Sequence, residues 1–514
     1  MGFAPALLVA RLREPRRRLV RCTQWRQVYR ESADHPRQRV SLVNAWTFHT
    51  GDLGEDFDDK NHSFQASPVL WDRRLFFSTS SGVAFAINAT TGEQVWRFDP
   101  AIPRDVHYSQ RSSRGVALWH DPSRSDGTSC KHRVFLPTPI GSLFALDAIT
   151  GKVCPEFGDQ GSVDLRATAL LDEQDIELEP GEYSVTSPPV TFRNLVIVGS
   201  ALGDNRGVIL ERGVARALDA NTGKEVWRFD PVPRRHEDPA RSTWSGDSAD
   251  RTGGANAWPP LSVDAQLGLV FIPTGSPSPD FYGGERHGDN RYANSLVALD
   301  ADSGELVWSQ QMVHHDVWDY DLPVQPVLVD LEWSGERIPS VVIATKSGML
   351  FSFRRDNGEP VHPIEERPVP ASDVKGERTS PTQPFSSLPA LVSHKSIGSD
   401  DLFGVIYFDK SACEDELAGL RADGIFTLPS LQGTLMNPGW AGGVNWCGVA
   451  IDADRQIAVV NVNQLPGIVR LIPRDQVEAV RSSGELEGWQ LSMQRGTPYA
   501  MARRMFLHPS ICPA

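Results

Sequence analysis

Hydrophobic and polar residues alternate along most of the chain, in short runs that end at Gly, Asn, Asp or Ser. This alternation is typical of strands with one buried face, because successive side chains of a strand point to opposite sides. Pairs of such runs lie at 67–82, 187–200 and 338–348. Helical spacing of apolar residues is clearest at 410–424. The pattern predicts an all-β chain with a helix in an inserted loop.

A repeated hairpin runs through the same pattern. The copies are VAFAINATTGEQVWRFDP (83–100), SLFALDAITGKVCPEFG (142–158), VARALDANTGKEVWRFDP (214–231) and SLVALDADSGELVWSQQ (295–311), with a weaker fifth, MLFSFRRDNGEPVHP (349–363). In the first four copies an apolar strand is followed by Asp or Asn, then Thr or Ser, then Gly, which are residues of tight turns. We expect positive φ angles at the turn glycines, which are Gly92, Gly151, Gly223, Gly304 and Gly358.

Three copies return from the turn with a tryptophan: Trp96, Trp227 and Trp308. An indole is large enough to fill the gap between neighbouring sheets. The turn glycines are 54 to 81 residues apart, which leaves room for about four short strands and long loops in each repeat. The pattern favours a β-propeller over a solenoid or a sandwich.

Composition narrows the classes of function. The 514 residues carry a net charge of −14, which argues against a nucleic-acid partner and against docking on anionic lipid. No run of about eighteen apolar residues predicts a transmembrane segment. The six cysteines form neither CxxC nor CxxCH, which disfavours a thiolate zinc site and attached haem. Cys130 and Cys154 flank a hairpin-like segment, and they either pair in an exported protein or remain free buried thiols.

The N-terminal residues, MGFAPALLVARLREPRRRLVR, place a short apolar stretch before the arginines. A secretory signal has the opposite order. We therefore expect a poorly defined basic segment over 1–40, with a damaged export signal as the alternative. The folded domain is expected over 41–514.

Four motifs accompany the tryptophan repeat: HHDVWDYDLP (314–323), ATKSG (344–348), GGVNWCGVAID (442–452) and TGSPSPDFYGGERHGDNRYANSLVALD (274–300). Together they resemble the pyrroloquinoline quinone (PQQ) dependent dehydrogenases, most closely the glucose, quinate and shikimate type. The similarity runs from about residue 45 to the C-terminus. It implies an eight-bladed β-propeller that holds PQQ and one Ca²⁺ near its axis, in the periplasm. It also implies oxidation of an aldose hydroxyl, or alternatively of a quinate- or shikimate-type polyol, with electrons passed to a quinone.

The resemblance assigns roles to several acids. Asp319 matches the catalytic base that takes the alcohol proton, and a turn aspartate is the plainer alternative. Asp321 follows two residues later, and positions i and i+2 of a strand-like segment face one side, so both carboxylates can approach one cation. Asp204 matches an acid beside the metal, where Ca²⁺ takes oxygen ligands. The adjacent His314 and His315 point to opposite faces of such a segment, which argues against a shared zinc ion.

The resemblance also assigns the contacts to PQQ. These residues are Lys346, Arg114, Trp258, Asn445, Trp446 and Asn205. A lysine stabilises charge on the reduced cofactor, an arginine fork fits its carboxylates, and an indole stacks on its plane. Ser113 and Ser276 depart from the family pattern, since relatives usually have Cys and Asn there.

The ends of the chain depart further. Residues 24–44 are a degraded likeness of the segment that opens the family's propeller, and 496–514 resembles a mid-domain segment of relatives. We therefore expect the last blade or blades to be missing from this chain. Three hypotheses remain: an active PQQ-dependent dehydrogenase, a truncated member with little activity, and a non-catalytic propeller scaffold. The joint presence of Asp319, Lys346, Asp204 and Arg114 argues against the scaffold.

Overall fold

The computed structural model describes residues 44–52, 63–103, 106–167, 169, 181–402 and 407–508, and the backbone of three further strands. These are β1 (Ala6–Arg11), β2 (Val20–Cys22) and β35 (Cys512–Pro513). The basic segment predicted over 1–40 lies outside the described residues apart from β1 and β2. Within the described part, no helix is both long and apolar enough to cross a bilayer.

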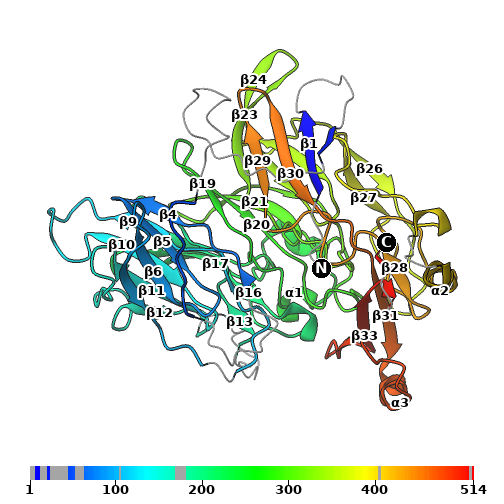
Figure 1. The fold of residues 1–514 in the computed structure, drawn as a ribbon. Coiled ribbons are helices and arrows are strands. Elements are labelled where there is room, and N and C mark those ends of the chain that lie inside the picture. The colour runs from blue at the N-terminus through cyan, green and yellow to red at the C-terminus, as the bar shows by residue number, and fades with distance from the viewer. Residues whose placement is uncertain are drawn as a thin grey trace.

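Four-stranded antiparallel sheets follow one another along the first part of the chain (Figure 1). The first sheet contains β4 (Val69–Trp71), β5 (Arg74–Ser78), β6 (Ala84–Asn88) and β7 (Gln94–Phe98). The second sheet contains β9 (Ala117–His120), β10 (His132–Pro137), β11 (Ser142–Asp147) and β12 (Ser162–Asp164). The third sheet contains β14 (Val190–Phe192), β15 (Leu195–Val198), β17 (Ala215–Asp219) and β18 (Glu225–Phe229). The fourth sheet contains β19 (Ser262–Asp264), β20 (Leu269–Pro273), β21 (Ser295–Asp300) and β22 (Leu306–Gln311). Each sheet holds one copy of the repeat, which confirms the all-β prediction.

The fifth copy of the repeat forms a three-stranded sheet of β23 (Val327–Trp333), β24 (Glu336–Ala344) and β25 (Leu350–Arg354). The expected returning strand is reduced to one bridge between Phe353 and Pro360. Pro360 and Pro363 lack the backbone N–H that a further strand needs for pairing, which accounts for the difference.

Two more four-stranded sheets follow. One joins β28 (Thr434–Met436), β31 (Gly467–Pro473), β33 (Tyr499–Met505) and β32 (Gln490–Ser492). The other pairs β29 (Val449–Asp452) and β30 (Ile457–Val462) with β1 and β2, so that β1 lies beside β30 although they come from distant parts of the sequence (Figure 1).

The remaining elements lie in the connections. The helix expected at 410–424 is present as α2 (Tyr407–Ala418), which begins earlier and ends before Gly419. Two short helices are α1 (Ser248–Arg251) and α3 (Val477–Ser482). Four two-stranded sheets pair β3 (Ser63–Phe64) with β8 (Ser112–Ser113), β13 (Tyr183–Ser184) with β16 (Ala201–Leu202), β26 (Ile364–Pro368) with β27 (Thr382–Ser386), and β34 (Leu507–His508) with β35.

The repeat tryptophans join neighbouring sheets. The ring of Trp227 lies against Gly304 of the next sheet, where an added Cβ would come within 2.6 Å of the indole. Its Nε1 donates a hydrogen bond to the carbonyl of Ala301 at 3.0 Å. Trp96 meets Gly151 and Trp308 meets Gly358 in the same way. The turn glycine therefore serves two needs at once, namely a positive φ and room for an indole.

The φ angles confirm the prediction made for the turns. They are 75°, 71°, 71°, 74° and 75° at Gly92, Gly151, Gly223, Gly304 and Gly358. The second copy has no tryptophan, and a methyl group of Val163 lies against Gly223 in its place. In the second sheet Cys130, which precedes β10, and Cys154, which follows β11, form a disulfide, which decides between the two alternatives for these cysteines.

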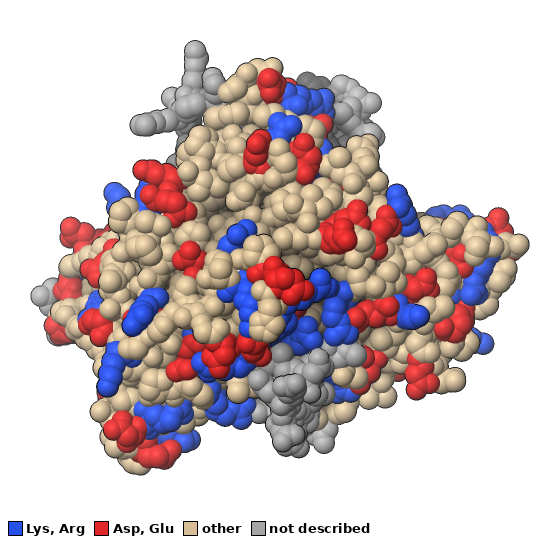
Figure 2. All heavy atoms as spheres, turned by 180° about the vertical axis from the view of Figure 1, so that it is seen from behind, with Lys and Arg blue, Asp and Glu red and all other residues tan. Residues whose placement is uncertain are grey.

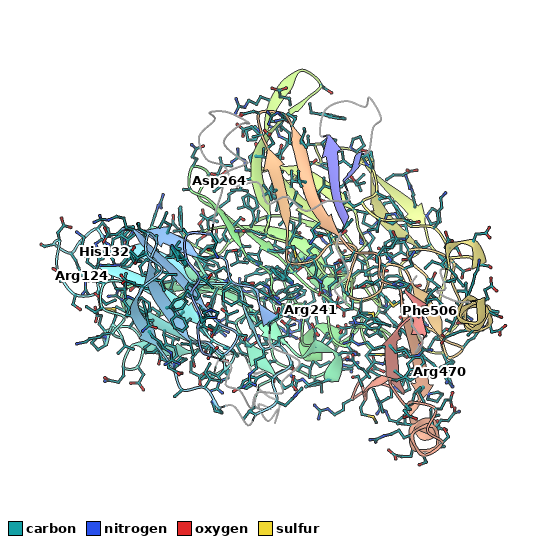
Figure 3. All side chains as sticks on the ribbon, viewed as in Figure 1. Arg124, His132, Arg241, Asp264, Arg470 and Phe506 are labelled. Atoms are coloured by element: carbon teal, nitrogen blue, oxygen red, sulfur yellow. A yellow bond between two sulfur atoms is a disulfide. The ribbon has the colours of Figure 1, made fainter. Side chains whose placement is uncertain are left out.

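Charged side chains add to these joints. Arg355 donates from Nη1 to Asp264 at 2.7 Å and from Nη2 to Asp330 at 2.7 Å, which connects the fourth sheet to the fifth (Asp264 is labelled in Figure 3). Acidic and basic side chains are interspersed over the face shown in Figure 2. Indole packing and ion pairs therefore both hold neighbouring sheets together.

We predict that Gly304→Ala lowers the free energy of unfolding by about 1 to 3 kcal/mol more than Gly335→Ala, because only the first forces a methyl group into an indole. Gly335 is a matched control: its φ is +82° and nothing lies within 4 Å of an added Cβ. Urea denaturation followed by tryptophan fluorescence measures both variants. Equal losses would show that the φ angle alone demands glycine.

Candidate active site

A cavity of about 700 Å³ opens among the loops that leave several of these sheets. All nine residues assigned from the sequence line it, namely Arg114, Asp204, Asn205, Trp258, Asp319, Asp321, Lys346, Asn445 and Trp446. The fold thus brings together residues that are far apart in the sequence. The volume is in the range of small-molecule sites. The roles assigned to the residues stay predictions.

Most of these residues lie within a few residues of a strand end, whereas Asp319 and Asp321 lie in the middle of a longer loop. Arg114 follows β8, and Asp204 and Asn205 lie in a 3-10 turn shortly after β16. Asp319 and Asp321 lie in the loop between β22 and β23, and Lys346 follows the end of β24 by two residues.

Asp316 organises the loop that carries Asp319 and Asp321. Its carboxylate accepts hydrogen bonds from the backbone N–H of Trp318 at 2.9 Å and of Tyr320 at 2.8 Å. The side chains of Trp318 and Tyr320 are fully buried. Of the three aspartates in this motif, Asp316 is therefore the turn acid.

The loop is not strand-like, contrary to the expectation from the sequence. Asp319 has a φ of 60°, in the left-handed region, and 316–323 form no strand. The hydrogen bonds from two backbone N–H groups to Asp316 hold the chain in a turn, so side chains do not alternate between two faces as they would in a strand. The expected convergence of the two carboxylates is nevertheless present, because the turn brings both to one ammonium group.

Lys346 is that group. Its Nζ donates to Oδ1 of Asp319 at 2.5 Å and to Oδ2 of Asp321 at 2.7 Å. Asp321 also accepts from Nε1 of Trp258 at 3.1 Å and from the backbone N–H of Ser276 at 2.7 Å. A carboxylate with so many donors is fixed in orientation and stays ionised.

The pKa values follow from burial and from these partners. Burial raises the pKa of Asp319 to about 7, with Lys346 opposing the rise and Asp321 adding to it. Burial acts on Asp321 too, but Lys346 and the hydrogen bonds hold the pKa of Asp321 below its ordinary value. Burial, followed by the charges of Asp321 and Asp319, raises the pKa of Asp204 to about 8. The cavity therefore contains one firmly ionised acid and two that titrate near neutral pH.

Another part of the wall, which meets the acids at Trp258, is aromatic and cationic. The guanidinium carbon of Arg114 lies 4.9 Å from the ring centre of Trp258 and 6.0 Å from that of Trp446. Its Nη1 donates to Thr186 at 2.6 Å, while its buried Nε has no partner among the described residues. Asn445 holds the loop, since its side chain bonds the carbonyl of Ala441 and the N–H of Trp446 at 2.7 Å each. This wall suits a planar, anionic group.

Two buried oxygens beside the acids also lack a partner in the described part of the chain, Oδ1 of Asn205 and Oδ1 of Asp280. Burial and then Asp204, Asp319 and Asp321 raise the pKa of Asp280 well above its usual range. Unpartnered amide and carboxylate oxygens among mutually repelling acids suit a hard cation such as Ca²⁺. The described side chains do not form a preformed cluster of three metal-binding groups, and Lys346 lies between Asp319 and Asp321.

The two histidines of the motif face different partners. His315 is fully buried, with Nδ1 at 2.7 Å from the carbonyl of Gly288 and Nε2 at 2.8 Å from Glu377. His314 contacts Gln311 and Glu366. The two rings therefore contact different segments of the chain.

Sequence reasoning missed many residues of the cavity wall, and Asp280, Trp440 and Arg503 are among them. Asp280 lies in the 274–300 motif, where its place between Pro279 and Phe281 gives no pattern of its own. Arg503 follows the alternation of β33, whose Met501 also faces the cavity. That alternation was the available signal for Arg503.

Comparison with known proteins gives consistent matches. Residues 33–514 match the family described as "PQQ: Glucose/ethanol/alcohol dehydrogenase, beta-propeller domain". Quinoprotein glucose dehydrogenase A of Acinetobacter calcoaceticus is 36% identical over 487 residues, which are 91% of this chain and 59% of that protein. Quinate/shikimate dehydrogenase (quinone) of Acinetobacter baylyi is 33% identical over 497 residues, which are 92% of this chain and 59% of that protein.

A solved structure supports the same fold. The quinohemoprotein alcohol dehydrogenase of Comamonas testosteroni superposes with a TM-score of 0.57 and 25% identity, over 80% of this chain and 53% of that chain. The chain thus has the β-propeller fold predicted from its repeats, and the number of blades in a closed ring stays a prediction. It spans about three-fifths of the length of the curated relatives it matches.

The raised pKa of Asp204 predicts a pH dependence of stability in protein freed of metal ions. A carboxyl group with a raised pKa binds its proton more tightly in the folded protein than in the unfolded chain. Its contribution therefore makes folding less favourable as the pH rises from about 4 to about 8, by up to about 1.4 kcal/mol per pH unit. Asp204→Asn should flatten this dependence. Urea titrations in chelator at pH 5, 6.5 and 8 measure it, and parallel curves for variant and wild type would contradict the assignment.

Proposed function

The chain belongs to the PQQ glucose/ethanol/alcohol dehydrogenase β-propeller family, and we propose that it oxidises a hydroxyl group of a sugar or cyclic polyol. The observation that carries the proposal is the convergence of Asp319, Asp321 and Lys346 on one cavity. Oxidation of an alcohol needs a base for the hydroxyl proton and a cation beside the reacting oxygens. These three residues supply both in one place.

Asp319 is the proposed base. Its pKa of about 7 places it where it is partly ionised at neutral pH and binds a proton well once it has taken one. Lys346 favours the ionised form before proton transfer and orients the carboxylate through a 2.5 Å hydrogen bond. Asp321 keeps Lys346 charged and in place through the second bond at 2.7 Å. The base is therefore positioned before the substrate arrives.

PQQ is the proposed cofactor and supplies the carbonyl group that accepts the hydride. Trp258 and Trp446 offer indole faces for its rings, and the unpartnered Nε of Arg114 offers a donor for a carboxylate. Lys346, Asn205 and Asn445 complete the proposed contacts. Their joint position on the cavity wall supports this assignment.

Ca²⁺ is the proposed metal, with Asp204, Asp319 and Asp321 as the proposed ligands. The unpartnered oxygens of Asn205 and Asp280 beside these acids support a hard divalent ion. Binding it would require Lys346 to give up part of its contact with Asp319 and Asp321. The high pKa values of Asp204, Asp280 and Asp319 would then fall, because the cation favours the ionised carboxylates, and Asp319 would be ionised and able to accept a proton.

We propose a quinone as the final electron acceptor and the periplasm as the location. The relative from Acinetobacter baylyi carries "quinone" in its name, which supports the acceptor. The disulfide between Cys130 and Cys154 supports an oxidising compartment. An aldose and a quinate-type polyol are both candidate substrates, because relatives of both kinds match at similar identity.

We predict that Asp319→Asn lowers turnover at least about 100-fold, because the amide cannot accept the hydroxyl proton. A dye-linked oxidation assay of protein reconstituted with PQQ and Ca²⁺ measures the rate with glucose, quinate and shikimate. Asp356→Asn is the matched control, since Asp356 lies in the turn after β25 with 54% of its side chain exposed. Turnover of Asp319→Asn within tenfold of wild type would place the base elsewhere.

We also predict that a strong chelator releases bound PQQ and that Ca²⁺ restores its retention. The physical reason is that a divalent ion held by Asp204, Asp319 and Asp321 would offset their negative charge and so would favour an anionic cofactor in the same cavity. Absorbance of the filtrate after ultrafiltration measures the released cofactor, and Mg²⁺ in place of Ca²⁺ tests the preference for a larger ion. Full retention of PQQ in excess chelator would argue against a metal requirement for PQQ binding.

A further inference from the structure

Arg503 is the one cation of β33 that reaches the cavity among the residues described there. Its side chain is 24% exposed, so part of the guanidinium is accessible from the cavity. It lies 3.6 Å from Oδ2 of Asp319, on the other side of that carboxylate from Lys346. The proposed base therefore has a second cation beside it, and none of the sequence motifs predicted that cation.

The guanidinium of Arg503 is held in place from three sides. Its Nε donates to Oε1 of Gln490 on the neighbouring strand at 3.2 Å. Its central carbon lies 4.9 Å from the ring centre of Trp440 and 5.7 Å from that of Phe281. Two aromatic faces and one hydrogen bond leave the planar fork little freedom, so little conformational entropy is lost when it binds a ligand.

The contact between Arg503 and Asp319 leaves bonding capacity on the fork. At 3.6 Å the Nη1 and Oδ2 atoms form an ion pair that is too long for a hydrogen bond. The terminal N–H groups can therefore bind a substrate oxygen while the charge of Asp319 stays balanced. A carboxylate matches a guanidinium fork best, because two parallel hydrogen bonds form at once.

We propose that Arg503 is a specificity-determining residue that binds a carboxylate of the substrate, so that the preferred substrate is a polyol that carries an acid group near the hydroxyl that is oxidised. The proposal rests on the proposed function for the position of the reacting hydroxyl at Asp319. Arg503 orients the acid group, and Asp319 receives the hydroxyl proton a few ångströms away. A neutral sugar leaves the fork with weaker, single hydrogen bonds.

The next residue on the strand provides a matched control. Arg504 is 23% exposed and lies 4.9 Å from the ring centre of Trp489, and it bonds Glu416. It shares with Arg503 the charge, the exposure and an aromatic neighbour. Because adjacent residues of a strand face opposite sides, Arg504 lies on the other face of β33.

Calorimetric titration with quinate and with its methyl ester tests the proposal independently of turnover. The two ligands share the ring and its hydroxyls and differ in the charge of one group. The full chain is titrated as purified and again with PQQ and Ca²⁺. Wild type should bind the acid about 10- to 100-fold more tightly than the ester, the size of a charged hydrogen-bonded pair.

Arg503→Leu should abolish this preference, Arg503→Lys should keep part of it because it retains the charge without the fork, and Arg504→Leu should keep all of it. A wild-type protein that binds both ligands equally would overturn the proposal, and so would an Arg503→Leu variant that retains the preference. Preferential binding of the acid without any turnover would instead count against the proposed function and leave the role of Arg503 standing.

Discussion

Two carboxylates that share one buried ammonium group constrain the centre of this molecule. Asp319 and Asp321 both bond Nζ of Lys346 inside a cavity where Asp204 and Asp280 add further acid groups. Burying an unpaired charge costs several kcal/mol, so Asp319 and Asp321 need a cation or a set of donors at hand, whereas burial and repulsion raise the pKa values of Asp204 and Asp280. The loops that carry Lys346, Trp258 and Ser276 supply them, and each loop comes from a different stretch of the chain.

The outer parts of the fold explain how those loops are held in position. Each repeat tryptophan locks its own sheet to the turn glycine of the next, with an indole against a residue that has no side chain. Asp316 then fixes the loop beyond β22 by accepting hydrogen bonds from two backbone N–H groups. Within this turn Asp319 takes a left-handed backbone conformation. Strain of this kind persists at functional sites where the surroundings over-determine the backbone. The chemistry proposed for Asp319 thus depends on packing that begins at the sheet edges.

The fold could be predicted from the sequence because the residues of the repeat show directly which turn and which packing contact they need. Gly304 needs a positive φ and Trp227 needs a partner surface, and both needs are visible in the motif. Residues of the site were predictable where a motif of the family contains them, as for Asp319 and Lys346. Asp280 and Arg503 were missed because their importance arises from contacts between distant segments. The prediction that 316–321 is strand-like was wrong. The backbone there is set by hydrogen bonds to the Asp316 side chain, and the spacing of apolar and polar residues gives no sign of such bonds.

The most direct test of the central claim is an anaerobic absorbance measurement on the full chain loaded with PQQ and Ca²⁺. The account predicts that adding quinate or glucose converts bound PQQ from its oxidised to its reduced spectrum, with one equivalent of substrate consumed for each cofactor. This single turnover needs no electron acceptor, so it isolates the proposed chemistry from any partner. Bound PQQ that keeps its oxidised spectrum with every sugar and polyol tried would contradict the account.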